Sequence, residues 1–522
     1  MIFSWRQYFK WAVALIVALA LCPFFIGMLI EDQLKSLAKS IPLIHGVRAE
    51  LVHYHRGWLH STAQFQLRLV DSKGTQVLDQ DADAGEPLTL SLGQKIYHGP
   101  VIFYTDELSN DWKLALTRAI IKNRLQLAVV EEAHWQEVFP YRQFFSGLSR
   151  ISFLGEINGQ LQTHTLSLRG KQAEVQVDVN GVMLEWSLAS EEDHLTATLT
   201  VDQIEYQNKE QKTTISELTL ENDYQLNEEN LWLGDSKLAI NFIAIAAQGI
   251  TYLQARELEL ITHSKRMANV ITSAITVNLQ QGFLDQVSYG PGTMSIVFRN
   301  IDVPAMVKIK QLISAFQQHQ VGTSNATVQE QRLGNKELQQ KIAEILPDLL
   351  GHGLQLAISP AYLETPQGEL TFQGFITFPD NRHGQQQKVD LDWLISRSDG
   401  TLTVKVPQAL APVLIELLRA QPGASKLPFA LAAEKNNETL LANWLQQGIL
   451  VEKGENYFFS ISYKQGQLLL NGRPLQEFKE GNGAGGRTRT DTMSPSPDFE
   501  SGASTNFTTP AWDSGLSIEL RH

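Results

Sequence analysis

The sequence predicts a β-dominated α+β protein: one N-terminal transmembrane helix, then an elongated antiparallel sheet with a few packed amphipathic helices. Three observations predict it. Many stretches alternate apolar and polar residues, the two-residue period of a strand with one buried face. Glycine, asparagine and aspartate separate these stretches at short intervals, which is typical of hairpins rather than βαβ units. An uncharged run of twenty residues, Trp11–Ile30, stands near the N-terminus.

Composition limits the classes of partner and chemistry. The chain has 522 residues, of which 43% are hydrophobic and 19% charged, as in globular proteins. The net charge of -13 argues against nucleic-acid binding, because phosphates are bound by clustered lysine and arginine. The single cysteine, Cys22, lies within the apolar run, so the rest of the chain has no disulfide and no thiolate metal ligand.

The apolar run is long enough to cross a membrane. Twenty helical residues span about 30 Å, the thickness of a hydrocarbon core. Arg6 and Lys10 precede the run and an acidic pair begins at Glu31, so the basic side is expected to stay in the cytoplasm. We therefore predict a bacterial inner-membrane protein with a cytoplasmic tail over residues 1–10, a single anchor over residues 11–30 and a periplasmic bulk.

Two processed forms of the N-terminus are the alternatives. A cleaved signal peptide has a shorter apolar core and a small-residue cleavage site, whereas Phe24 and Phe25 occupy the end of this run. A lipoprotein would be modified at Cys22, but Leu21 before it is large and Pro23 follows it directly. The uncleaved anchor is favoured.

Strand signals fill most of the remaining chain. Alternating apolar residues predict strands around 63–69, 166–168, 175–179, 195–201, 238–242, 402–406, 459–463 and 468–470. Asparagine–glycine or aspartate–glycine pairs, which favour tight hairpin turns, stand at 158–159, 180–181, 399–400 and 471–472. This spacing predicts an antiparallel meander.

Amphipathic helices interrupt the strands in the second half. Helical periodicity covers Pro304–Phe316 with Asp302 as its N-cap, a stripe over 338–349 ended by Gly351 and Gly353, and the segments 410–418 and 440–445. A polar linker over 317–334 is expected between the first two. We divide the chain into a β-rich region over 31–300, a helix-plus-strand region over 301–480 and a tail over 481–522.

Four short motifs combine residues that shape turns and cores. They comprise Tyr54, Arg56, Gly57, Trp58 and Ser61; His98, Gly99 and Pro100; Trp232 and Gly234; and Tyr463, Gly466, Asn471 and Gly472. Structural roles are expected for them. Gly57 permits a strand to bend or bulge, Trp232 anchors a core, and Asn471 with Gly472 makes a tight turn.

In this order the motifs resemble the YdgA-like family of bacterial envelope proteins, a domain of unknown function, over residues 7–478. The resemblance implies an inner-membrane or periplasmic location and self-association, and it supplies no catalytic residues. Residues 481–522 depart from the family. They are rich in Gly, Ser, Thr and Pro without apolar periodicity, so we predict a disordered tail that arises from read-through.

Candidate catalytic or metal-binding residues are few. His53 and His55 would share one face of a strand, a usable metal geometry, but Gly57 interrupts the strand before His60 and no carboxylate follows closely. Exposed or packing roles are favoured for these histidines and for His98. Nucleophile, phosphate-loop and zinc-protease motifs do not occur in the sequence.

The sequence therefore favours a non-enzymatic, membrane-tethered scaffold or binding protein without a cofactor. A concave apolar face of the sheet would bind lipid or another hydrophobic ligand. One alternative is an extracytoplasmic hydrolase that brings His98 together with an acid and a serine. The other is a homomeric interaction protein, such as a homodimer paired through strand edges or the helices between residues 304 and 350.

Overall fold

A computed structural model describes most of the chain. The described residues are 22–31, 47–69, 89–105, 111–127, 143–169, 175–191, 193–284, 287–322, 328–380, 391–420, 436–464 and 466–474. Residues 11–21 of the anchor expected over 11–30, and the whole tail expected over 481–522, lie outside them. Within these ranges, no helix combines the length and the apolar composition needed to cross a bilayer.

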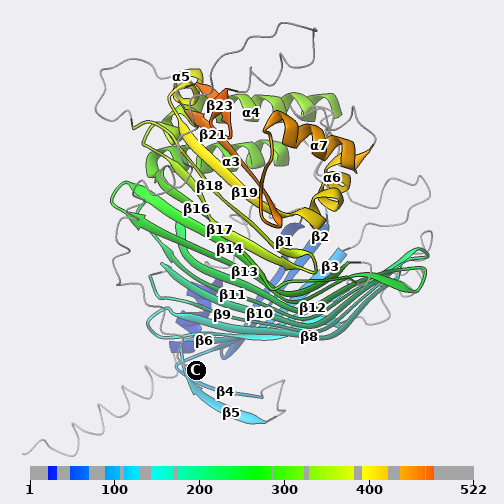
Figure 1. Cartoon of the computed structure of the whole chain (residues 1–522). Helices are drawn as coiled ribbons and strands as arrows, with labels where there is room; N and C mark the ends of the chain where they lie inside the picture. Colours follow the sequence, from blue (N-terminus) through cyan, green and yellow to red (C-terminus); the bar gives the residue numbers. More distant parts are fainter. Residues whose placement is uncertain are drawn as a thin grey trace, which may run out of the picture. The chain divides into compact units, whose positions relative to one another are not determined.

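One antiparallel sheet of 21 strands dominates the structure (Figure 1). Its strands are β1 (Val47–Arg56), β2 (His60–Leu69), β3 (Thr89–His98), β6 (Ala119–Leu127), β7 (Gln143–Ile151), β8 (Ile157–Arg169), β9 (Gln176–Leu188), β10 (His194–Gln207), β11 (Gln211–Leu226), β12 (Trp232–Ala247), β13 (Ile250–Met267), β14 (Val270–Leu284), β15 (Val287–Tyr289), β16 (Gly292–Asp302), β17 (Gln355–Thr365), β18 (Gly368–Thr377), β19 (Asp399–Pro407), β20 (Val451–Lys453), β21 (Asn456–Lys464), β22 (Gln467–Leu470) and β23 (Arg473–Pro474). A separate hairpin joins β4 (Val101–Thr105) to β5 (Trp112–Leu116).

The sheet confirms the predicted β-dominated antiparallel fold. Strands that follow one another in the chain are mostly neighbours in the sheet, as in a meander. Short excursions interrupt this order where β3 pairs with β6, β14 with β16 and β19 with β21. Strands β8 to β14 curve together around one side (Figure 1).

Three of the four predicted tight turns are not turns. The Asn158–Gly159 pair lies within β8, Asn180–Gly181 within β9, and Asp399–Gly400 opens β19; only Asn471–Gly472 lies between two strands, β22 and β23. The reason is pairing on both sides: β8 and β10 bond to Asn180 and Val182, so β9 continues through the local irregularity at Gly181 instead of turning. Gly181 has φ +62°, a conformation that glycine adopts without strain.

The amphipathic segments form helices as predicted. They are α3 (Val303–Gly322), α4 (Val328–Leu350), a turn η1 (Gln408–Leu410) that leads into α6 (Ala411–Ala420), and α7 (Asn437–Gln447), with a short α5 (Leu391–Ser396) in addition. Asp302 caps α3, since its Oδ1 accepts from the backbone N–H of Ala305 at 2.7 Å. The expected linker over 317–334 is wrong in large part, because both helices extend into it and only 323–327 lie outside the described residues. The segment is polar, which is typical of a linker, but glutamine and glutamate also favour helices, and helices form here.

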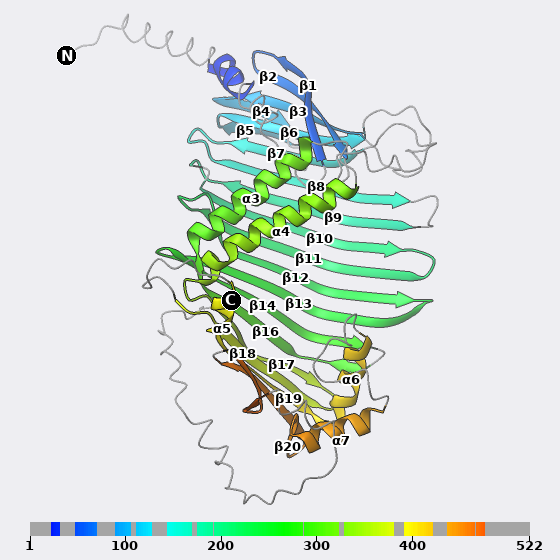
Figure 2. The same cartoon turned by 90° about the horizontal axis from the view of Figure 1, so that it is seen from above.

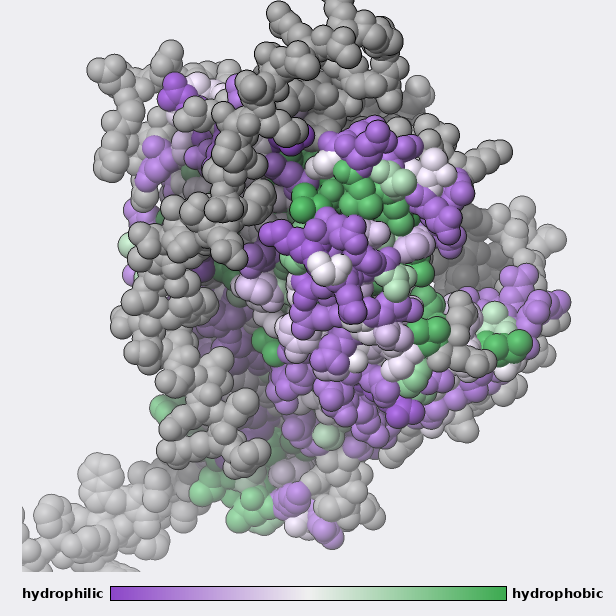
Figure 3. Space-filling model, in the orientation of Figure 1, coloured by the Kyte–Doolittle hydropathy of each residue, from purple (hydrophilic) through white to green (hydrophobic). Residues whose placement is uncertain are grey.

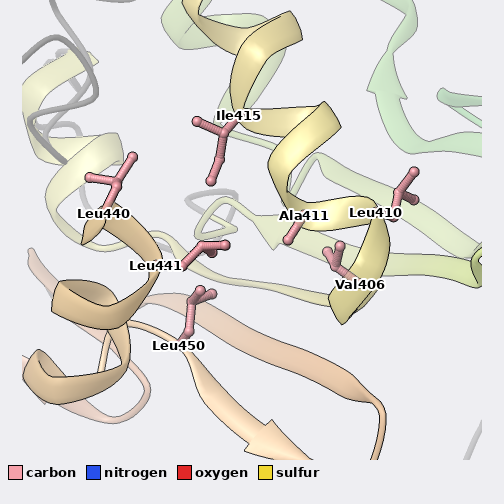
Figure 4. Packing of buried hydrophobic residues seen from close by; sticks show 7 residues of the cluster. All are labelled: Val406, Leu410, Ala411, Ile415, Leu440, Leu441 and Leu450. Atoms are coloured by element: carbon pink, nitrogen blue, oxygen red, sulfur yellow. The ribbon is translucent and has the colours of Figure 1, made fainter. Parts of the chain in front are cut away.

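The C-terminal helices close a compact core. Figure 4 shows the side chain of Ile415 directed towards Leu440 and Leu441 of α7, and these residues belong with Leu410 and Ala411 to one buried cluster. Asn436 caps α7 and the left-handed Gly448 ends it. This end of the molecule is packed as an ordinary globular core.

A helix over residues 22–31, here named the N-terminal helix, packs on the opposite end of the sheet (Figure 2). Ile26 and Ile30 are buried in a cluster with Ala63, Phe65 and Ile96. These strand residues come from β2 and β3, so the second half of the apolar run lies against the sheet.

Candidate functional site

The first motif surrounds the N-terminal helix. The hydroxyl of Tyr54 donates to the carbonyl oxygen of Gly27 at 3.3 Å. Arg56 forms an ion pair with Glu31 at 3.3 Å, and its guanidinium lies 5.1 Å from the ring centroid of Phe24. The motif therefore holds the helix on the sheet by one hydrogen bond, one ion pair and one cation–π contact.

His98 lies beneath the same helix. It is 2% exposed, and its Nδ1 lies 3.4 Å from the carbonyl oxygen of Trp58. A Cβ placed on Gly27 would lie 2.5 Å from Cε1 of the imidazole, so the helix approaches the ring at its glycine. Burial lowers the pKa of His98, and the carbonyl of Trp58 opposes this shift only in part. The environment favours a neutral imidazole.

The neighbouring motif residues shape the turns below the helix. Gly57 lies in the turn between β1 and β2, where its N–H donates to the carbonyl of His60 at 3.0 Å; the expected bulge inside a strand is therefore wrong. Gly99 donates to the carbonyl of Arg118 at 2.8 Å, and the Gly99–Pro100 peptide is cis. Ser61 is 1% exposed.

The later motifs lie elsewhere in the sheet. Trp232 opens β12 and is 41% exposed, so the prediction of a core anchor is wrong; its neighbour Leu231 is buried against Val303 of α3 instead. Gly234 donates its N–H to Ser264 Oγ at 3.0 Å.

The last motif connects α7 to the end of the sheet. Asn471 Nδ2 donates to the carbonyls of Gly448 at 2.8 Å and Ile449 at 2.9 Å, and Asn471 Oδ1 accepts from the backbone N–H of Ser460 at 2.8 Å. Asn471 and Gly472 form a turn, as expected. Tyr463 lies near the end of β21, and Gly466, which has φ +80°, stands directly before β22. The role of this motif is structural.

The histidines do not assemble a metal centre. His53 and His55 are exposed on β1, and the ring of His60 stacks near Tyr97 with centroids 6.3 Å apart. Over the described ranges, no group of three or more His, Cys, Asp or Glu side chains could hold a metal ion.

A second feature extends along the sheet itself. Cross-strand registry aligns two rows of apolar side chains, here named the apolar face. The first row contains Leu161, Leu184, Leu199, Leu220, Leu238, Leu260, Val277 and Met294, from eight successive strands. The second row, two residues along, contains Val182, Val201, Leu218, Ile240, Leu258 and Leu279.

The other side of the same strands is polar. The row adjacent to the first apolar row contains Gln160, Glu185, Thr198, Glu221, Lys237, Ile261, Thr276 and Ser295. Here Lys237 pairs with Glu259 at 2.9 Å, and this hydrogen bond is the main cause that lowers the pKa of Glu259. Apart from Ile261, these adjacent rows therefore place apolar side chains on one face of the strands and polar side chains on the other.

The first row of the apolar face is only half-buried, whereas Val201 and Ile240 of its second row are buried. All eight side chains of its first row keep part of their surface exposed, whereas a face covered by a second layer would be buried. Helix α3 starts on this side, because Val303 packs on Ile271, which shares a face of β14 with Val277. Figures 1 and 2 show α3 and α4 passing over the hollow side of the curved strands.

A continuous antiparallel sheet with one mostly apolar and one mostly polar face defines the class: a β-dominated protein built on a single large sheet. The chain matches the family model of a bacterial protein of unknown function (DUF945) over residues 10–478 and belongs to that family. The comparisons with curated proteins and with solved structures gave no match.

Proposed function

We propose that this chain is a non-enzymatic envelope protein of the YdgA-like kind, tethered to the bacterial inner membrane, that binds lipid acyl chains or a similar hydrophobic chain. The observation that carries the proposal is the apolar face. Eight aligned apolar side chains from neighbouring strands remain half-buried and form one continuous row across the sheet.

The energetic argument is direct. Full burial of a leucine, valine or methionine side chain contributes about 1.5–3 kcal/mol relative to exposure. The side chains of the first row keep only a minor part of their surface exposed, so a hydrocarbon chain covering the whole row would gain roughly a few kcal/mol in total. Leu220 and Leu238, paired across β11 and β12, stand in the middle of this row.

The tether is the apolar segment Trp11–Ile30, with Arg6 and Lys10 on its cytoplasmic side. In the structure its second half is the N-terminal helix, with Ile26 and Ile30 buried against the sheet and Phe25 and Leu29 exposed. Residues 11–21 alone would span only about 16 Å, so a full crossing of the bilayer requires this helix to leave the sheet. The orientation proposed is a cytoplasmic N-terminus and a periplasmic sheet.

Two alternatives have weaker support. A hydrolase using His98 would need that residue to reach a substrate, but His98 is 2% exposed and Ser61 is 1% exposed. A homodimer through strand edges or through α3 and α4 would show directly as twice the monomer mass in light scattering of the full chain.

Lipid extracted with the purified full chain, measured by mass spectrometry, tests the binding function. The double variant Leu220→Gln/Leu238→Gln places two polar groups in the apolar face and is expected to reduce bound lipid at least about tenfold, the effect of 1.4 kcal/mol or more. The control Thr219→Gln/Ala239→Gln alters the paired positions on the polar face and should retain lipid. Equal lipid in both variants would contradict the proposal.

A further inference from the structure

The hairpin β4–β5 turns its apolar side to solvent. Its register aligns Val101 with Leu116, Phe103 with Leu114 and Thr105 with Trp112, which places these side chains on one face. Phe103 is 67% exposed and Trp112 is 78% exposed, whereas Ile102 on the other face is 3% exposed. Figure 3 shows hydrophobic residues gathered where Figure 1 places β4 and β5. A hairpin that packs in a core buries its large apolar side chains, whereas here Phe103 and Trp112 face solvent.

Two turns extend this apolar surface. The N–H of His98 donates to the carbonyl of Leu59 at 2.9 Å, and β4 begins directly after Pro100. On the other side, Arg150 donates to the carbonyl of Leu116 at 3.3 Å, close before the turn that carries Leu154. Leu59 is 64% exposed and Leu154 is 86% exposed.

The N-terminal helix borders the same surface. Its Phe24 ring lies 5.7 Å from Trp58, which is 52% exposed beside Leu59. Phe25 and Leu29 of this helix are 58% and 54% exposed. The uncharged sequence 11–21 directly precedes this helix, so the most apolar part of the chain adjoins the exposed apolar surface.

We infer that this docking surface lies in the interface between headgroups and acyl chains of a phospholipid bilayer. The surface consists of the exposed face of β4–β5, the turns at 58–59 and 153–154, and the outer side of the N-terminal helix. Tryptophan and phenylalanine are the side chains that partition best into this zone. The inference rests on the proposed membrane tether and adds the surface by which the sheet itself meets the lipid.

The charge distribution favours a bilayer as the occupant. Residues 1–150 contain 15 Lys and Arg and 14 Asp and Glu, so the whole excess of negative charge, -13 for the chain, lies beyond residue 150. Anionic headgroups therefore repel this end of the protein least. With β4–β5 seated on the membrane, the rest of the sheet extends away from it.

A fluorescence experiment on the full chain tests the inference. In a Cys22→Ala background, an environment-sensitive dye is attached at Phe103→Cys or at Ile250→Cys, two positions that are each 67% exposed. The protein is reconstituted into phosphatidylcholine–phosphatidylglycerol vesicles with or without nitroxide-labelled lipid. We expect the nitroxide lipid to quench the dye at position 103 about twofold or more and to leave the dye at position 250 unchanged.

Flotation of the same vesicles separates the two proposals. Protein that floats with the vesicles but shows no quenching at position 103 would overturn the docking surface and leave the tether intact. Protein that does not float would overturn both. A dye at position 103 that is shielded without nitroxide quenching, together with a dimer in light scattering, would assign the surface to a second copy of the chain and overturn the inference.

Discussion

Gly27 of the N-terminal helix lies against the imidazole of His98, so close that a Cβ at position 27 would stand 2.5 Å from Cε1. This contact joins a helix from the apolar run to the motif of His98, Gly99 and Pro100. Tyr54 bonds to the carbonyl of the same glycine, so two motif residues meet the helix at one point. The close docking of this helix therefore requires glycine, which has no side chain, at position 27.

The first prediction concerns that glycine. Gly27→Ala should weaken docking of the N-terminal helix, because a buried ring must move to admit the methyl group, at a cost of about 1–3 kcal/mol. Without the contact to His98, alanine would stabilise the helix by roughly 1 kcal/mol relative to glycine. A loss of exchange protection in Gly27→Ala therefore identifies the contact, and a gain would argue against it. Hydrogen exchange of residues 22–31 measures it. Met28→Ala, at the exposed neighbouring position, is the control and should change protection little.

The second prediction concerns pH. Burial holds the pKa of His98 below the ordinary value of 6.5, which the undocked side chain keeps. Below pH 6.5 the undocked state therefore takes up the proton first, so docking is strongest above 6.5 and is lost progressively as the pH falls towards the lowered pKa.

Exchange protection of residues 22–31, corrected for intrinsic rates, should fall between about pH 7.5 and pH 5. His98→Gln should flatten this dependence, whereas substitution of the exposed His53 by glutamine should leave it unchanged. A wild-type profile without pH dependence in this range would contradict the assignment.

The third prediction concerns the bend in the curved strands. Gly181 has φ +62°, and a Cβ there would lie 1.8 Å from Oδ2 of Asp202 on β10. Gly181→Ala should lower the free energy of unfolding by about 2–4 kcal/mol, from a clash and a left-handed backbone that costs roughly 1–2 kcal/mol.

Adding Asp202→Ala should restore the steric part and leave the backbone part. Chemical denaturation of the single and double variants measures both. A double variant that is no more stable than Gly181→Ala would show that the side chain of Asp202 is not the obstacle.

Much of the fold follows from the sequence because alternation is a local property. The strands around 195–201 and the helix capped by Asp302 are confirmed for that reason. The pair Asn180–Gly181 misleads because its turn preference is local, while the pairing that keeps β9 extended comes from β8 and β10. Register across strands is not encoded in any single segment.

The site was less accessible to sequence reasoning. The motif around Tyr54 was identified, but its contact with the N-terminal helix depends on a fold-back that periodicity does not reveal. The size of Trp232 predicts a core position, yet it opens β12 and is 41% exposed. The apolar rows needed the register that places Leu199 beside Leu220.

The fourth prediction concerns orientation in the membrane. Alkaline phosphatase fused after residue 480 should be active and a green fluorescent protein at the same point should be dark, because Arg6 and Lys10 keep the N-terminus in the cytoplasm. Replacing both basic residues by glutamate should reduce phosphatase activity. A bright cytoplasmic fluorophore on the unaltered chain would contradict the proposed topology.

The most direct test of lipid binding by the apolar face is site-specific photocrosslinking in living cells. A photoreactive phenylalanine analogue at Leu220 faces the apolar side of β11, and the same analogue at the adjacent Thr219 faces the polar side. Mass spectrometry of the purified protein should find lipid attached at position 220 and none at position 219. Lipid at both positions in equal amount, or at neither, would contradict the account.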